Sequence, residues 1–153
     1  MSTSSLSDKD TRRLMRETRS MHRNILRAAR ADDVHALRSQ MNALLDPHKS
    51  PLVLLTHGPD QSSIVPMVDA AILSASRGNE LTKMELLHNM ENVSRSFGFD
   101  TQSIAHVVCA TELAGGLKHV SGLTRQEMHS DMMAHIDAAG MSNMGLCIPD
   151  ALS

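Results

Sequence analysis

The fold class follows from residues 8–30, DKDTRRLMRETRSMHRNILRAAR, in which two kinds of side chain are separated at helical spacing. Small or apolar side chains recur at steps of three and four residues, which is the period of one face of an α-helix. These residues are Leu14, Thr18, Met21, Ile25 and Ala28. Arginines recur at the same steps on the opposite side, namely Arg12, Arg16, Arg19, Arg23, Arg27 and Arg30. We therefore predict a long amphipathic helix over this stretch.

Helical periodicity continues through the chain, and Asp, Thr, Gly and Pro residues mark where helices begin and end. Further helices are predicted over residues 34–45, 64–76, 82–97, 101–113 and 124–139. The expected fold is all-α, a compact bundle of about five to six amphipathic helices in a single domain. That helical domain is expected to span residues 8–140, between a disordered start at 1–7 and an irregular tail at 141–153.

The composition constrains the core of this domain. A chain of 153 residues fits one domain, but it has no Trp, no Tyr and two Phe, against twelve Met. Leu, Met, Ala, Ile and Val are therefore expected to fill the interior. Met fills irregular gaps in cores and also serves adaptable binding surfaces.

The connection over residues 47–63 is long for a helical bundle. It contains Pro51, Gly58 and Pro59, and a short extended piece is expected at Leu52–Leu55. Connections of this length are more often functional or mobile than tight loops between bundle helices. The connection is therefore the second candidate contact region.

Pairs of segments resemble one another at predicted helix starts. Leu81–Leu86 and Leu123–Met128 each place a Thr and a Glu three residues apart before an apolar stripe, which is typical of a capping box. Arg30–Val34 and Arg77–Leu81 both resemble the turn between paired helices of repeat proteins. The first pair of segments is 42 residues apart and the second pair is 47 residues apart, so the two pairs do not share one repeat length. Shared capping chemistry is the preferred explanation, and a true helical repeat is the alternative.

The arginine ridge, defined as Arg12, Arg16, Arg19, Arg23, Arg27 and Arg30, is the main candidate for function. Each guanidinium group offers a planar fork to a carboxylate or a phosphate. Residues 1–40 hold nine Lys or Arg against five Asp or Glu, whereas residues 41–153 hold six against twelve. The acidic body, and the absence of aromatic residues that would stack on bases, favour a solvated face or an acidic protein surface, either the chain's own or a partner's. The acidic protein surface is the preferred interpretation, a nucleic-acid phosphate backbone is the alternative, and a solvated face is the third.

His106 and Cys109 are the only pair in the sequence that suggests metal binding or catalysis. They lie one helical turn apart and could supply half of a zinc site or a thiol–imidazole couple. A structural zinc site needs four ligands, and further ligands could come only from the tertiary structure. The candidates for these are Cys147, His119, His129 and His135. A core cysteine beside a partly exposed histidine is the favoured interpretation, so no metal and no cofactor are expected.

Two short resemblances to known families are confined to a few residues. Pro51–Gly58 resembles the strand and His-Gly turn of α/β-hydrolases, which implies an oxyanion donor, but Thr56 is an extra residue and no G-x-S-x-G sequence follows. Gly122–Thr124 resembles the hairpin of helix-hairpin-helix DNA-binding motifs, with Thr124 in place of the second glycine. Because of these departures, the first resemblance does not lead us to expect a hydrolase. The second resemblance agrees with nucleic-acid binding, the alternative function of the arginine ridge.

These observations together predict a non-catalytic helical interaction module, a regulator, adaptor or effector from a microbe or its virus. Residues 1–7 lack the apolar segment of a secretory signal peptide, and apolar runs such as Leu52–Leu55 are too short to span a bilayer. A cytoplasmic location without membrane contact is expected, with signal-peptide-independent export as an alternative. A homo-oligomer that shares its core would give the same sequence pattern as a monomer.

Overall fold

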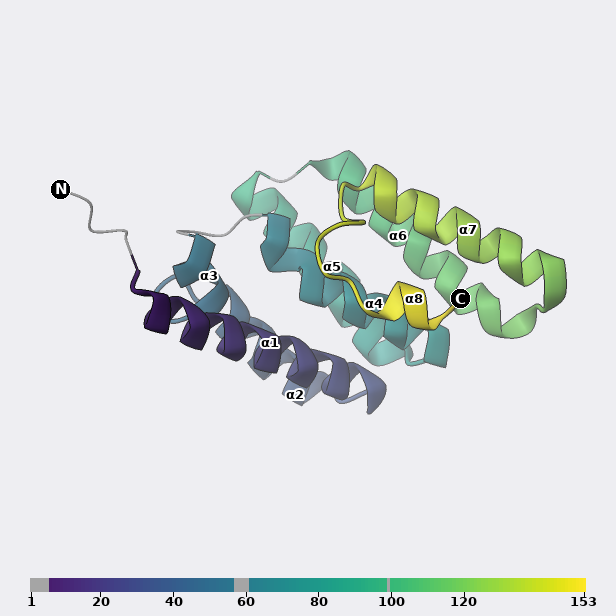
Figure 1. Cartoon of the computed structure of the whole chain (residues 1–153). Helices are drawn as coiled ribbons and strands as arrows, with labels where there is room; N and C mark the ends of the chain where they lie inside the picture. Colours follow the sequence, from purple (N-terminus) through teal and green to yellow (C-terminus); the bar gives the residue numbers. More distant parts are fainter. Residues whose placement is uncertain (1–5, 57–60, 99) are drawn as a thin grey trace.

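The computed structural model describes residues 6–56, 61–98 and 100–153, and within them it is helical without strands, as predicted. The six long helices correspond to the predicted ones, and two short helices were not predicted (Figure 1). The α-helices are α1 (Asp8–Arg30), α2 (Val34–Leu45), α3 (Pro51–Thr56), α4 (Val65–Arg77), α5 (Glu80–Phe97), α6 (Thr101–Gly116), α7 (Gly122–Ala138) and α8 (Ile148–Ala151). Two 3₁₀ turns are η1 (Gln61–Ile64) and η2 (Leu117–His119).

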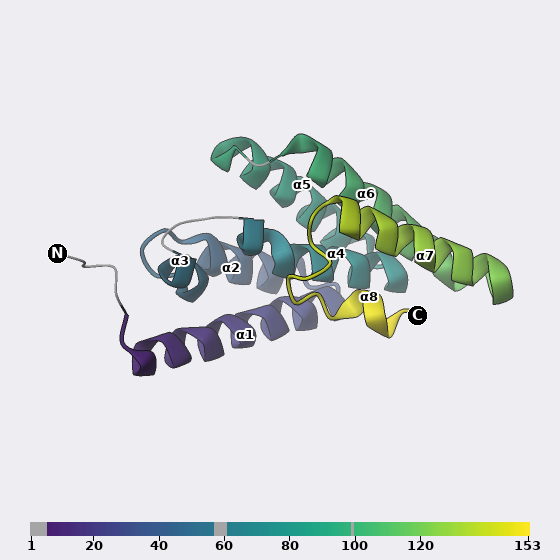
Figure 2. The same ribbon diagram turned by 45° about the horizontal axis from the view of Figure 1, so that its top comes forward.

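The long helices form three hairpins, α1–α2, α4–α5 and α6–α7, that are stacked in chain order. The first helix of each hairpin packs on the first helix of the next, so that α1 contacts α4 and α4 contacts α6. Helix α7 packs on α6 at the end of this row. Figure 2 shows the result, with α1 and α7 on opposite sides of the molecule and α4 between them.

Helix α4 is the centre of the core. Every residue from 65 to 75 is buried, including the small residues Ala70 and Ala71 that allow close packing. The sequence predicts a single buried face for this helix. It is instead buried all round, because α1, α5, α6 and α8 surround it. The core also contains fully buried methionines, as the composition predicts, among them Met67, Met90 and Met132.

The two turns that resemble each other in sequence also have the same backbone. Asp32 and Gly78 adopt positive φ angles of 53° and 73°. In each turn the N–H of the following residue donates to the carbonyl five residues earlier, which is the Schellman pattern of a helix end. The turns that close α1 and α4 are therefore equivalent.

These equivalent turns cap each other's helices. Asp32 accepts hydrogen bonds at 2.9 Å from both the backbone N–H and the hydroxyl of Thr82 in the first turn of α5. Asn79 donates from Nδ2 to the carbonyl oxygen of Ala29 at 2.8 Å, near the end of α1. Backbone groups that a helix end leaves without partners are thus satisfied by the neighbouring hairpin.

The predicted capping boxes are wrong. Asn79 is the N-cap residue of α5 and Ser121 is that of α7, so Thr82 and Thr124 lie inside their helices. The Thr82 hydroxyl is turned into the core, where Asp32 and Ser74 bind it. Its hydrogen bonds are made across the fold, and a local pattern does not reveal them.

The connection at 47–63 contains a helix where an extended piece is predicted. Helix α3 packs on α1 and α2, and Leu52 and Val53 are buried while Leu54 is exposed. The Ser50 hydroxyl accepts from the N–H of Val53 at 3.4 Å, which supports the first turn of this helix. Part of the candidate contact region, residues 57–60, lies outside the described residues.

The tail at 141–153 packs around a buried carboxylate; residues 141–147 carry no helix, and the short helix α8 follows them. Asp69 of α4 is fully buried and accepts hydrogen bonds from the N–H groups of Cys147 and Ile148 at 3.0–3.1 Å. It also binds Nε2 of His22 on α1 at 2.8 Å. The tail carries α8 and is therefore fixed to the centre of the molecule. At the start of the chain, Ser7 caps α1 from within the stretch expected to be disordered, and residues 1–5 lie outside the described part.

Candidate functional site

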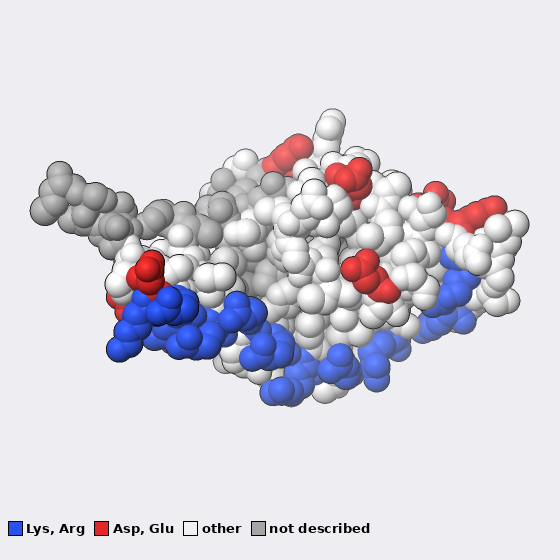
Figure 3. Space-filling view, in the orientation of Figure 1, with Lys and Arg blue, Asp and Glu red and all other residues white. Residues whose placement is uncertain are grey.

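The arginine ridge lies along the outer face of α1. All six side chains are exposed. Eighteen residues of helix separate the first from the last, which corresponds to about 27 Å of helix length. Figure 3 shows the ridge as a band of Lys and Arg along the lower edge of the molecule.

The opposite face of α1 holds the ridge outward. Leu14, Ile25, Ala28 and Ala29 are buried on that face, where α1 packs on α4. The Ser7 hydroxyl caps the helix by accepting from the N–H of Asp10 at 3.0 Å. Acidic residues in the first turn and arginines in the last turn suit the helix dipole. The ridge is therefore carried by a well-anchored helix.

The ridge arginines are not neutralised by the fold. None of them forms an ion pair with another residue in the parts of the chain that the structure describes. Arg13, on another face of α1, does pair with Asp10 and Glu17, at 3.8 and 4.0 Å. Like charges three or four residues apart on a helix repel each other by about 0.2–0.5 kcal/mol per pair. The helix thus keeps a row of mutually repelling cations open to solvent.

Two more cations continue the ridge across the hairpin turns. The hydrogen bond from Asn79 to Ala29 places the start of α5 beside the end of α1, where Arg30 lies. Arg77 is exposed at the end of α4, and Nζ of Lys118 lies so close to Gly78 that a Cβ atom there would be 2.5 Å away. Figure 3 shows blue atoms beyond the end of α1, toward the region where α6 meets α7. Sequence analysis missed these residues, because only the stacking of the hairpins brings them to the ridge.

His106 and Cys109 are not brought together with a set of metal ligands. Nδ1 of His106 lies 3.0 Å from Nδ1 of His135 on α7, with the ring centroids 5.2 Å apart. Across residues 6–56, 61–98 and 100–153 no group of three His, Cys, Asp or Glu side chains is arranged to hold a metal ion. Cys109 is exposed, so the favoured interpretation of a core cysteine is wrong. Cys109 lies on a different face of α6 from Val107 and Ala110, which are buried in the core.

The second cysteine, Cys147, is not activated as a nucleophile. The side chain is exposed, but partial desolvation raises the pKa of its thiol above the ordinary value, and the nearby Asp69 and Asp150 carboxylates raise it further. A thiol is a strong nucleophile only as the thiolate, so this cysteine is held in its less reactive form near neutral pH.

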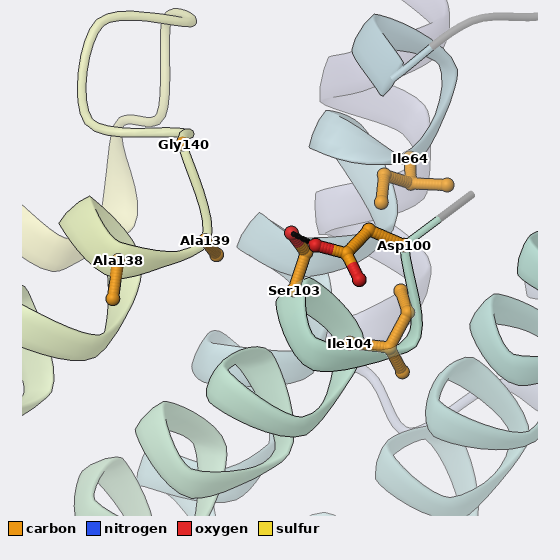
Figure 4. A pocket seen from close by; sticks show the side chains of 7 residues that line it. All are labelled: Ile64, Asp100, Ser103, Ile104, Ala138, Ala139 and Gly140. Carbon is orange, nitrogen blue, oxygen red and sulfur yellow. Dashed lines mark hydrogen bonds between the residues drawn. The ribbon is translucent and has the colours of Figure 1, made fainter.

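A cavity of about 310 Å³ lies between η1, the start of α6 and the end of α7 (Figure 4). Its ionisable lining residue is Asp100, which is occupied in capping α6. Asp100 accepts from the N–H of Gln102 at 3.0 Å and from the hydroxyl of Ser103 at 3.4 Å. Ser103 also lines the cavity, with its hydroxyl bound to Asp100, and the remaining lining residues are apolar or glycine, so the cavity does not assemble a catalytic group with a base.

A larger hollow of about 730 Å³ lies between α5 and α6. Its walls include the apolar side chains of Met84, Leu87 and Val108. The charged residues at its rim, Glu91 and Arg95, lie 3.4 Å apart and pair with each other. The hollow therefore offers apolar surface but no uncompensated charge that would select a charged ligand.

Comparison of the chain with known protein families, with curated proteins and with solved structures finds no match. In the described parts of the chain, no helix has the length and apolar character needed to cross a membrane.

Proposed function

We propose that this protein is a non-catalytic interaction module that docks an acidic surface of a partner protein through the arginine ridge. The supporting observation is the row of six exposed guanidinium groups, which has no ion-pair partner in the described residues. The proposal includes a role as a regulator, adaptor or effector and a cytoplasmic location.

The charge of the rest of the molecule supports a protein partner over nucleic acid. A polyanion that followed the ridge would pass close to an acidic body, since residues 41–153 hold twice as many acidic as basic residues. Helix α1 has no Phe, Tyr or Trp on which a base could stack, and the ring of His22 is bound to Asp69. Nucleic-acid binding is the second candidate function. Arg77 and Lys118 lengthen the basic surface, and a longer row of cations could contact more phosphates along a backbone.

Charge pairs alone do not give a tight complex. An exposed pair of a guanidinium and a carboxylate contributes about 0.2–1 kcal/mol, so six pairs contribute a few kcal/mol, roughly the free energy of millimolar binding. Apolar contact must add to this. Met15 provides it, because it lies beside the ridge on α1 and 45% of its surface is exposed. The ridge would then supply orientation and association rate, and Met15 part of the affinity.

The experiment is a capture of partners from a lysate of the cells that make the protein, with and without nuclease. Three forms are compared: the natural chain, Arg16→Glu/Arg23→Glu, and the control Arg13→Glu/Arg95→Glu, which changes the net charge equally outside the ridge. We expect a discrete protein that is captured by the natural chain and the control and lost with the ridge variant. The nuclease treatment should not change this result.

Capture of the same protein by the ridge variant would contradict the proposal. Recovery of nucleic acid, with all proteins lost after nuclease, would support the alternative. Far-ultraviolet circular dichroism verifies that each variant remains helical. The substituted residues are exposed, so we expect no loss of helix.

A further inference from the structure

The outer face of α6 and α7 contains a hollow of about 460 Å³ that is bordered by two carboxylates. The contact between His106 and His135 sets the antiparallel register of the two helices. In that register Glu112 of α6 comes opposite Asp131 of α7, and both line the hollow. Both are exposed, and neither has a cationic partner in the part of the chain that the structure describes.

The walls of this hollow are mainly apolar. Val108, Leu113 and Ala134 line it together with Cys109 and His135, and 36% of the surface of Val108 is exposed. An arginine side chain matches this arrangement, because its methylene stem packs on apolar surface while its guanidinium binds carboxylates. The hollow is therefore suited to receive an arginine that another molecule presents.

The chain itself presents such arginines, but on the opposite side of the molecule. The stacking order α1, α4, α6, α7 separates the arginine ridge from the hollow, as Figures 1 and 2 show. Helix α1 holds eight Lys or Arg against three Asp or Glu, whereas residues 80–138 hold four against eight. In Figure 3 the basic band follows the lower edge and most acidic groups lie above it. The two surfaces are complementary, and within one molecule they cannot meet.

We propose that the occupant of this hollow is the arginine ridge of a second copy of the chain. Arginines of one copy, with Arg16 and Arg19 at the centre, bind Glu112 and Asp131 of the next, and Met15 contacts Val108. This inference rests on the proposed function, since it names the partner that the ridge docks. Because the contact joins different surfaces of the two copies, it leaves one ridge and one hollow free at the ends and builds open chains of molecules.

The test is sedimentation velocity of the full chain from about 10 µM to about 1 mM, a range that reaches the millimolar affinity expected of exposed charge pairs and extends below it for the added apolar contact. The average mass should rise with concentration at about 0.02 M salt and fall to that of the monomer at about 0.5 M salt, where the charges are screened. Arg16→Glu/Arg23→Glu and Glu112→Lys/Asp131→Lys should each weaken association by about tenfold or more. The control Glu80→Lys/Glu91→Lys makes the same change in charge on α5 and should associate like the natural chain.

A mixture of the two interface variants gives the sharpest result. The ridge variant keeps an intact hollow and the hollow variant keeps an intact ridge, so we expect one contact per pair and a species that stops at the dimer. A natural chain that stays monomeric at low salt, or equal weakening in the control, would overturn the inference.

The outcomes also separate this inference from the proposed function. If the chain stays monomeric but its ridge still captures an acidic protein, self-association is wrong and the proposed function stands. If the ridge variant both associates and captures proteins as the natural chain does, both proposals are wrong.

Discussion

The buried carboxylate of Asp69 gives the most specific prediction about stability. It is fully buried in α4 and accepts hydrogen bonds from His22 on α1 and from the N–H groups of Cys147 and Ile148 in the tail. Replacement by Asn turns one acceptor oxygen into an NH₂ donor, and in either orientation of the amide this donor faces the N–H of Cys147, together with His22 or with the N–H of Ile148. The substitution keeps the volume of the side chain, so the change in the free energy of unfolding measures the loss of hydrogen bonds and charge rather than of packing.

The expected magnitude follows from the number of bonds lost. A hydrogen bond to a charged group contributes about 1.5–3 kcal/mol, and removal of one partner from a buried charged network costs about 3–5 kcal/mol. We expect Asp69→Asn to lower the free energy of unfolding by about 3–4 kcal/mol. For a chain of this length each kcal/mol corresponds to about 2–4 °C, so the midpoint of thermal unfolding should fall by roughly 10 °C.

The assay is urea unfolding followed by circular dichroism, since the chain has no Trp or Tyr for fluorescence. Hydrogen exchange should show the amides of Cys147 and Ile148 losing protection before those of the helices. Ser142→Ala is the matched control, because Ser142 lies in the same tail and its hydroxyl binds the exposed Asp137. A loss below about 1 kcal/mol, the net value of one ordinary hydrogen bond, with unchanged protection of the tail would contradict this role of Asp69.

Three further predictions concern other elements. Arg38→Met should reduce stability above about pH 4.5 and leave it unchanged in stronger acid, because the hydrogen bond from Arg38 lowers the pKa of Glu85 from 4.5. A carboxyl with a depressed pKa stabilises the fold above its unfolded value and loses this effect as the pH falls, so unfolding free energies from pH 3 to pH 7 should converge at the acid end. Thr82→Val should cost about 1–2 kcal/mol in urea unfolding, because it leaves Asp32 without the hydroxyl donor in a partly buried site. Cys147 should react with iodoacetamide more slowly than a model peptide thiol at pH 8, since partial desolvation raises its pKa, and equal rates by mass spectrometry would contradict this.

The sequence predicts those parts of the fold that depend on local periodicity. The stripe in residues 8–30 predicts the bounds of α1, and its arginines are exposed in the structure. Helix α4 shows what periodicity does not determine. A helix with small apolar residues on every side can be buried on one face or all round. Only the packing of α1, α5, α6 and α8 on it decides between these outcomes.

Partners that are distant in sequence account for the other errors. Thr82 resembles an N-cap residue, but its donor groups are taken by Asp32, which lies fifty residues earlier. Arg77 and Lys118 extend the basic surface only because the ends of α1, α4 and α6 lie side by side. The hollow formed by Glu112 and Asp131 depends on the register of α6 against α7 in the same way.

The mutual capping of the first two hairpins bears on how the chain folds during synthesis. In the described part of the chain, the carbonyl oxygens of Ala29 and Arg30 at the end of α1 accept from the side chain of Asn79, and the N–H of Thr82 at the start of α5 donates to the side chain of Asp32. A nascent chain that has just released α1 and α2 from the ribosome can close the end of α1 through the backbone bonds of its own turn, but it lacks the side-chain donor of Asn79. The side-chain bonds between the two turns form only when the residues around position 82 emerge. The two hairpins thus cap each other, and we expect the five helices that border these two turns or pack between them, α1 to α5, to form a single cooperative module.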